Sequence, residues 1–164
     1  MFLTVHSTVA ITLTQNIHNP AGAFLIGVIS HFILDSIPHG DEIFEKIGIK
    51  GMAKLAIIDH VGVIIMLSSI FLFKPDFIFT SSIIFAIIGA MTPDWLMAIY
   101  ELSKSGAKLP IGSLAPLILR FLNKITKPVY KLHSWVHRVI KYDINFSIGI
   151  TLQIILLVGF WLII

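Results

Sequence analysis

Three long apolar runs, residues 51–73, 77–100 and 144–164, constrain the fold of this chain more than any other feature. At about 1.5 Å of rise per residue, each run predicts a helix long enough to cross a hydrocarbon core of about 30 Å. A mean hydropathy of +0.92 and a charged fraction of 13% agree with that prediction. The sequence therefore predicts an integral membrane protein.

Two shorter apolar segments, residues 2–15 and 22–37, precede these runs and end at turn-forming residues such as Asn19, Pro20 and Pro38. As helices they would reach only about 21 to 24 Å, so whether they cross fully is left open. We expect an all-α fold, a polytopic membrane helical bundle of four to five membrane helices plus cytoplasmic amphipathic helices. Because no repeat or linker divides the sequence, residues 1–164 form a single domain.

The long connection at residues 101–142 is polar, basic and interrupted by prolines. Amphipathic pieces around residues 114–125 and 130–140 are predicted to lie on the membrane surface. Eleven of the twelve Lys and Arg residues fall on one side of the predicted membrane, and only Lys74 falls on the other. The positive-inside rule then predicts a cytoplasmic N-terminus, in an integral protein of a prokaryotic cytoplasmic membrane.

The segment His31-Phe-Ile-Leu-Asp35-Ser-Ile-Pro-His39 places ionisable groups in an otherwise apolar run. His31 and Asp35 lie one helical turn apart, and such groups inside a membrane segment usually mark a functional site. Further ionisable residues are predicted at the same cytoplasmic depth on other segments. The predicted metal ligands are His6, His31, Asp35, His39, Asp59, Asp94, His133 and His137.

Because the chain contains no cysteine, any metal would be held by nitrogen and oxygen atoms. This ligand set favours zinc, with manganese or iron as alternatives. A bound divalent ion lowers the pKa of water from about 15.7 to roughly 7, which produces a hydroxide for hydrolysis. We assign possible catalytic roles to Asp59, to His60 as an orienting or proton-shuttling residue, and to Arg138 as a phosphate-binding group. One ion or two would be compatible with these residues.

Three motifs carry a resemblance: Gly27-Val-Ile-Ser-His31 with Asp35, Thr92-Pro93-Asp94, and His133-Ser-Trp-Val-His137-Arg138. Together they resemble the inner-membrane, membrane-bound metal-dependent hydrolases, and the His-x3-Asp helix is more loosely similar to zinc-dependent phospholipase C. The resemblance implies a membrane hydrolase with a metal site. The chain departs from the family's Pro-Asp-x-Asp-His motif, which reads Pro93-Asp94-Trp95-Leu96-Met97 here, and His39, Asp59 and His6 would replace the lost ligands.

Each motif also has a purely structural interpretation. His31 and Asp35 could form a hydrogen-bonded pair that fixes helix packing. Asp94 could cap a helix broken at Pro93. His133 and His137 could belong to an interfacial helix anchored by an aromatic residue.

The leading hypothesis is a membrane-embedded metal-dependent hydrolase, with a lipid or membrane-associated phosphoester as substrate and the phospholipid bilayer as partner. The basic cytoplasmic side favours an anionic lipid. Nucleic acid is not expected, because the net charge is only +3 and topology explains it. The alternatives are a non-catalytic protein that binds or transports divalent metal and a scaffold without metal. The oligomeric state is left open.

Overall fold

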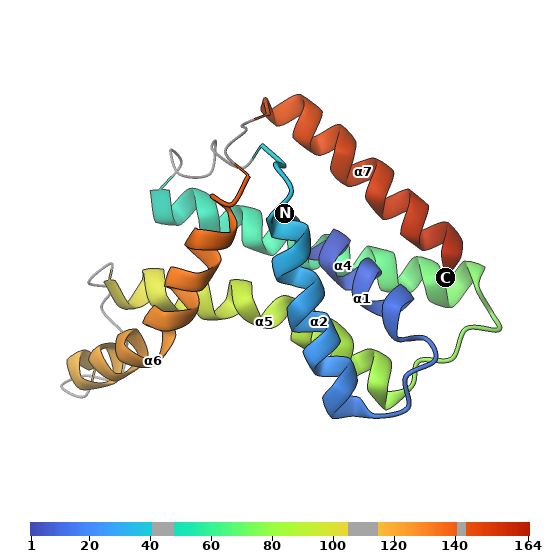
Figure 1. Ribbon diagram of the computed structural model, residues 1–164, viewed down its shortest axis with the longest axis horizontal. Helices are drawn as coiled ribbons and strands as arrows, with labels where there is room; N and C mark the ends of the chain where they lie inside the picture. The colour runs from blue at the N-terminus through green and yellow to red at the C-terminus, as the bar shows by residue number, and fades with distance from the viewer. Residues whose placement is uncertain (41–47, 105–114, 141–143) are drawn as a thin grey trace.

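The computed structural model describes residues 1–40, 48–104, 115–140 and 144–164, and these residues form six helices and no strand (Figure 1). The helices are α1 (Leu3–Thr14), α2 (Pro20–Asp35), α4 (Gly48–Phe73), α5 (Ser81–Lys104), α6 (Ala115–Val136) and α7 (Phe146–Ile163). The all-α prediction is confirmed. Lys46, Lys108 and Lys141, which contributed to the predicted orientation, lie outside the described residues, as do residues 105–114 and 141–142 of the basic connection.

Three helices of the described chain have the length and composition of membrane spans: Gly51–Phe73 within α4, all of α5, and α7. These spans correspond to the three apolar runs of the sequence, although α5 begins and ends four residues later than the predicted run 77–100. Helices α1 and α2 are apolar but shorter, and they do not meet the same criterion. The structure therefore supports three membrane-crossing helices by length and composition, and the predicted total of four to five spans is not confirmed.

Asparagine side chains begin two of the helices. Asn19 Oδ1 accepts hydrogen bonds from the amides of Ala21 and Gly22, at 3.0 and 3.3 Å, and Pro20 occupies the first helical position. Asn145 Oδ1 accepts from the Ile148 amide at 2.9 Å. Because proline fits the first turn, where its missing N–H is not needed, α2 begins two residues earlier than the apolar pattern alone predicts.

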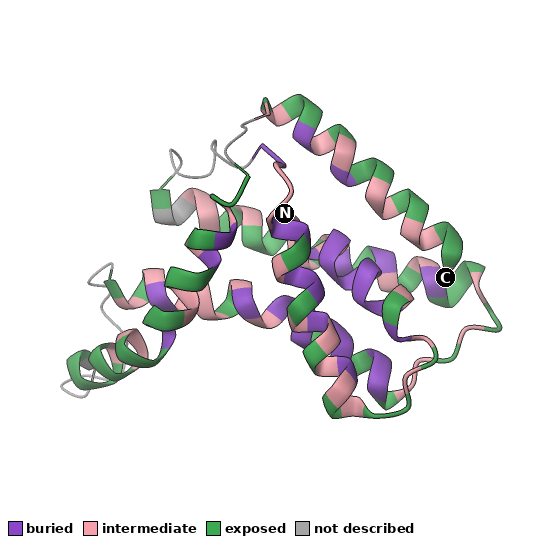
Figure 2. Cartoon of the chain, viewed as in Figure 1, coloured by how far each residue is buried: buried purple, intermediate pink, exposed green. Residues whose placement is uncertain are grey.

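Helix α1 is the buried centre of the bundle and contacts α2, α4, α5 and α7. Figure 2 shows α1 almost wholly buried, whereas α4 and α7 carry many exposed residues. Ile11 of α1 packs in a core with Ile70 and Ile83, and each of the three has at most 1% of its surface exposed. This distribution suits a bundle in which α1 is enclosed by protein and the outer faces of α4 and α7 face lipid.

Glycines bring α2 and α5 into close contact. A Cβ atom built on Gly27 would overlap the carbonyl oxygen of Ala86, and one built on Gly89 would overlap that of Phe24. Small residues permit such backbone approach between membrane helices. The contact sets His31, one turn after Gly27, against Ala90 of α5.

Helix α6 continues through Pro128 instead of forming two separate pieces, and Figure 1 shows it changing direction along its length. An internal proline removes one backbone hydrogen bond and bends a helix without necessarily ending it. Packing on α5 holds α6 in place, since the rings of Tyr100 and Tyr130 stack 4.2 Å apart and Asn123 donates to Ser103 Oγ at 3.1 Å. The C-terminal part of α6 thereby reaches the end of α2.

Candidate metal centre

The carboxylate of Asp35, at the last residue of α2, is the centre of a cluster of histidines. Its Oδ2 atom lies 2.9 Å from His31 Nε2, 3.0 Å from His133 Nε2 and 3.3 Å from His137 Nε2. Its Oδ1 atom lies 3.1 Å from His6 Nε2. The Asp35 side chain is fully buried. Side chains from α1, α2 and α6, and from the turn after α6, therefore meet at one carboxylate.

A second carboxylate, Asp94 of α5, completes a group that could hold a metal ion. Asp94 Oδ1 lies 3.2 Å from His133 Nε2 and 3.7 Å from His31 Nε2. Nitrogen and oxygen atoms of the four residues lie within 4.8 Å of one another. We call this set, His31, Asp35, Asp94 and His133, the first group. Two imidazoles and two carboxylates are a ligand set suited to a divalent transition metal.

A second group shares Asp35 with the first. It consists of Asp35, His39 and His137, whose ligand atoms again lie within 4.8 Å of one another. The rings of His39 and His137 lie 5.1 Å apart. The nitrogen of Met1 lies 2.6 Å from His39 Nε2 and 2.8 Å from Asp35 Oδ1. This second group lies where the chain leaves α2 and α6.

The facing atoms of the first group are close but do not form well-oriented hydrogen bonds. Within the described chain, the buried atoms His31 Nε2, His133 Nε2 and Asp35 Oδ2 have no hydrogen-bond partner of acceptable geometry, and neither does either ring nitrogen of His6. Leaving buried polar atoms unsatisfied costs roughly 1 to 3 kcal/mol for each group. Several such atoms pointing at one another are the arrangement expected of a metal site, because one ion satisfies them together.

Backbone carbonyls orient two of the imidazoles. His31 Nδ1 lies 2.7 Å from the Ala90 oxygen, and His39 Nδ1 lies 2.7 Å from the Ile37 oxygen. A carbonyl oxygen can only accept, so each Nδ1 donates and each neutral ring presents the lone pair of Nε2 to the cluster. Metal-binding histidines are commonly fixed in this way.

The two carboxylates of the cluster favour positive charge on His133. Burial disfavours the charged form of His133, but the carboxylates of Asp35 and Asp94 outweigh this effect and raise the pKa of His133 to about 9. His6, fully buried, stacks on the His31 ring with centroids 4.0 Å apart. A proton or a metal cation would be stabilised here by the same two carboxylates.

One side of the cluster reaches the surface. The side chains of His31 and Asp35 are fully buried and that of His133 is 4% exposed, whereas 27% of Asp94 and 20% of His137 is exposed. A structural metal site is normally closed by its protein ligands, and a catalytic site keeps a position open. The partial exposure of Asp94 and His137 gives this site an open side next to α5 and α6.

Two residues to which the sequence analysis assigned catalytic roles lie outside both groups. Asp59 accepts hydrogen bonds from the amides of Leu3, at 2.6 Å, and Thr4, at 3.2 Å, and so caps the start of α1 from a neighbouring helix. His60 Nδ1 lies 2.6 Å from the Ala56 oxygen, and its Nε2 accepts from Trp95 at 3.0 Å. Both nitrogens of His60 are therefore engaged.

Arg138, the predicted phosphate-binding residue, is exposed one residue after His137. Its Nε donates to the Ser134 oxygen at 2.9 Å. Because it follows the ligand candidate His137 directly, its terminal guanidinium nitrogens stay candidate phosphate donors.

The purely structural interpretations are compatible with the cluster only in part. His31 and Asp35 are in contact, but three further histidines also reach the same carboxylate. Asp94 does not begin a helix, because α5 continues past Pro93 to Lys104. Trp135 is 62% exposed on α6, so the same helix carries both an aromatic anchor and the buried His133.

Gln153 is a residue that the sequence analysis did not single out. From α7 it donates to the His39 carbonyl at 3.4 Å and accepts from the Phe2 amide at 2.7 Å. Gly149, one turn earlier, has no room for a Cβ beside the same carbonyl. The available signal was one amide side chain within the apolar helix Phe146–Ile163, and α7 thus fixes the turn that carries His39.

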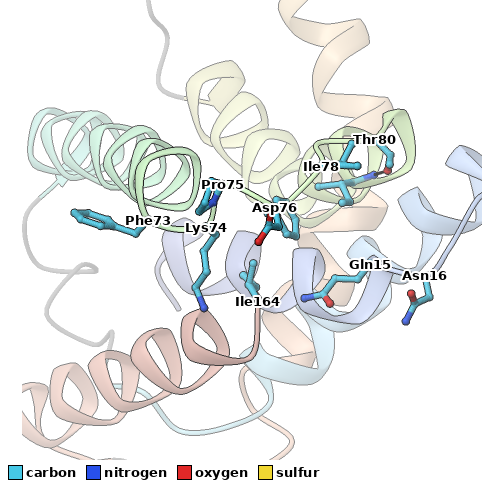
Figure 3. Close-up of a pocket in the computed structure, with 11 residues that line it drawn as sticks. Gln15, Asn16, Phe73, Lys74, Pro75, Asp76, Ile78, Thr80 and Ile164 are labelled. Carbon is cyan, nitrogen blue, oxygen red and sulfur yellow. Dashed lines mark hydrogen bonds between the residues drawn. The ribbon is translucent and has the colours of Figure 1, made fainter.

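The open pocket drawn in Figure 3, of about 600 Å³, is separate from the histidine cluster. Gln15 and Asn16, just beyond the C-terminal end of α1, line it together with Lys74, Asp76 and other residues of the α4–α5 connection. His6 lies in the first turns of α1. The pocket and the cluster therefore lie at opposite ends of the same helix.

Comparisons with protein families, curated proteins and solved structures find no match to this chain.

Proposed function

We propose that this protein is a membrane-embedded metal-dependent hydrolase of a lipid or membrane-associated phosphoester. The observation that carries the proposal is the first group, in which two imidazoles and two carboxylates from three helices lie within ligand distance of one another. Three of its buried atoms, His31 Nε2, His133 Nε2 and Asp35 Oδ2, have no well-oriented hydrogen-bond partner among the described residues. His31, Asp35, Asp94 and His133 would hold the ion. Zinc is the preferred metal for such a nitrogen and oxygen set, with manganese or iron as alternatives.

The chemistry depends on the open side of the site. A divalent ion held there would supply the positive charge that activates water for hydrolysis near neutral pH. Asp94 and His137, both partly exposed, line the approach of a substrate, and His6 packs against the far face of His31. This access supports a catalytic site over a closed structural one.

Helix α6 supports a substrate at an anionic membrane surface. Leu117, Phe121 and Ile125 recur every four residues and are all exposed. The exposed basic residues recur every three or four residues on an adjoining face; they are Arg120, Lys124, Lys127 and Lys131. An apolar stripe beside a basic stripe is typical of a helix lying among lipid headgroups.

This arrangement places the buried His133 on the same helix as the two exposed stripes. Headgroup phosphates drawn to the basic stripe would therefore lie near the open side of the cluster, with Arg138 next to it. The proposal retains the predicted topology, with α1 and α2 within the membrane bundle and the N-terminus and basic side facing the cytoplasm of a prokaryotic cell.

The proposal is tested on detergent-purified protein in mixed micelles. Elemental mass spectrometry gives the metal content, and phosphate release or loss of the headgroup is followed for a panel of phospholipids and lipid phosphates. We expect bound metal and metal-dependent hydrolysis in the wild type. We expect both to be lost in Asp35→Asn, which keeps the shape of the side chain but removes its charge.

His18→Ala is the matched control, because His18 is an exposed histidine in the α1–α2 connection. It should leave metal content and hydrolysis unchanged. Bound metal without hydrolysis of any phosphoester would instead support the non-catalytic metal-binding or transport function. Full hydrolytic activity of Asp35→Asn would refute the assignment of this cluster as the catalytic metal site.

A further inference from the structure

The carboxylate of Asp35 connects two sets of ligands. Asp35 belongs both to the first group and to the second, which adds His39 and His137. The first group already contains four residues, enough to hold one ion without them. His39 and His137 are therefore additional donors that a single ion does not require.

Hydrogen bonds and close packing also orient the ligands of the second group. His39 Nδ1 lies 2.7 Å from the Ile37 oxygen, which directs Nε2 inward to within 2.6 Å of the Met1 nitrogen, and His39 is 97% buried. An ion bound to His39 would take the place of this contact with Met1. Gln153 and Gly149 of α7 hold the His39 carbonyl. A turn tied to a separate helix positions this imidazole, so its orientation does not depend on the first group.

The two groups use different turns at the ends of α2 and α6, and only the first adds a residue of α5. His31 and Asp94 come from α2 and α5, whereas His39 follows α2 and His137 follows α6. His133 and His137 are one turn apart, with ring centroids 4.5 Å apart, so α6 presents one imidazole to each group. Of this i, i+4 pair, His133 belongs to the first group and His137 to the second.

We propose that the centre is dinuclear, with Asp35 bridging one divalent ion in the first group and a second ion held by His39 and His137. This inference rests on the proposed metal binding of the first group and extends it. Two neighbouring ions stabilise the attacking and the leaving oxygen of a phosphoester together, which favours phosphoester over carboxylic ester substrates.

The wild-type protein provides the first test. Detergent-purified protein is stripped of metal, reloaded with Mn²⁺ and freed of excess ion, and its manganese content is measured per chain. Electron paramagnetic resonance then reports whether the ions are close enough to couple. We expect two ions per chain and an exchange-coupled spectrum. One ion per chain with the six-line spectrum of isolated Mn²⁺ would overturn the proposal.

The paired variant His39→Ala with His137→Ala is the second test. It should lower the manganese content from two ions to one and replace the coupled spectrum with that of an isolated ion, while His18→Ala keeps two coupled ions. Circular dichroism and gel filtration check the fold of each variant. Two coupled ions retained in the paired variant would contradict the assignment of His39 and His137.

Failure of this inference and failure of the proposed hydrolase are distinguishable. One ion per chain together with hydrolysis would support the hydrolase and refute the dinuclear centre. Two coupled ions without hydrolysis of any phosphoester would establish the dinuclear centre and remove the hydrolase. Since the wild-type measurement needs no substitution, the outcome does not depend on whether a variant folds.

Discussion

Asp35 is a fully buried carboxylate that lies within 3.3 Å of imidazole nitrogens from four histidines. A buried carboxylate is expensive unless it is paired or coordinates a metal. The spacing of His31 and Asp35 in the sequence predicted one of these contacts. The others depend on histidines that lie far from Asp35 in the sequence, so the concentration of donors at a single carboxylate is a property of the folded chain.

Asp59 provides a prediction at the scale of one residue. Because its carboxylate accepts from the amides of Leu3 and Thr4, Asp59→Ala should lower the free energy of unfolding by about 1 kcal/mol, the usual loss for a helix cap. Asp59→Asn retains an oxygen acceptor and should restore much of that loss. Denaturation in detergent measures both, and metal content should stay at the wild-type level.

A different result would support a catalytic role for Asp59. If Asp59→Asn kept its stability and metal but lost hydrolysis, the carboxylate would be needed for its charge rather than as a cap. That outcome would support the catalytic role predicted from its place early in the third apolar segment.

At the scale of helices, the contact between α2 and α5 decides where His31 lies. Gly27 and Gly89 bring the two backbones together, and the Ala90 carbonyl at this contact orients the His31 ring. Small residues at this crossing are therefore part of the support for the metal site, although none of them is a ligand.

Gly27→Ala and Gly89→Ala should each force α2 and α5 apart. We expect a loss of roughly 1 to 3 kcal/mol, the range for overpacking a tight contact, together with weaker metal binding. Gly159→Ala is the control, because no atom lies within 4 Å of a Cβ at that position of α7. The melting temperature and a metal titration measure the effects. If both variants kept the wild-type melting temperature and metal affinity, close contact of α2 and α5 would not be needed for stability or for metal binding.

Helix α6 provides a second prediction at this scale. Replacing Lys124, Lys127 and Lys131 by Gln should lower the preference of the reconstituted protein for anionic lipid, by up to about 1 kcal/mol for each charge removed. Spin-labelled phosphatidylglycerol and phosphatidylcholine provide the comparison. Lys74 lies in the α4–α5 connection, on the other side of the predicted membrane, with its ammonium 4.8 Å over the Trp161 ring. The control variant Lys74→Gln should therefore not change the lipid preference. An unchanged preference in the triple variant would argue against a headgroup-binding face.

On the scale of the whole molecule, the cluster joins α1, α2, α5 and α6, together with the turns that follow α2 and α6. An ion held there binds the folded chain and not the unfolded one. Mass action then stabilises the fold by about 2.7 kcal/mol when free metal is 100-fold above its dissociation constant. The metal would add a further connection between these four helices.

Removal of metal should therefore lower the melting temperature. Tryptophan fluorescence during heating, with and without a chelator, measures the shift in wild-type protein. Asp35→Asn should melt at the same temperature in both conditions, because it has no ion to lose. A chelator that left the wild-type melting temperature unchanged, in protein shown to contain metal, would exclude this connecting role.

The sequence alone determined the class of the protein and the approximate limits of its helices. Apolar runs, asparagine caps and proline positions act within a few residues, so the segments 51–73 and 144–164 could be assigned without tertiary information. The same local reasoning predicted a polar pair at His31 and Asp35, because residues four apart share a helix face.

Only the tertiary structure decided which ionisable residues meet. Depth along a helix can be counted from the sequence, but the direction in which a side chain points depends on how the helices rotate and cross. Asp59 accepts from the amides that begin α1 and lies outside both ligand groups, whereas His133 joins Asp35 through the packing of α6 on α5. Contacts between backbones, such as those at Gly27 and Gly89, set these crossings, and no linear spacing of residues records them.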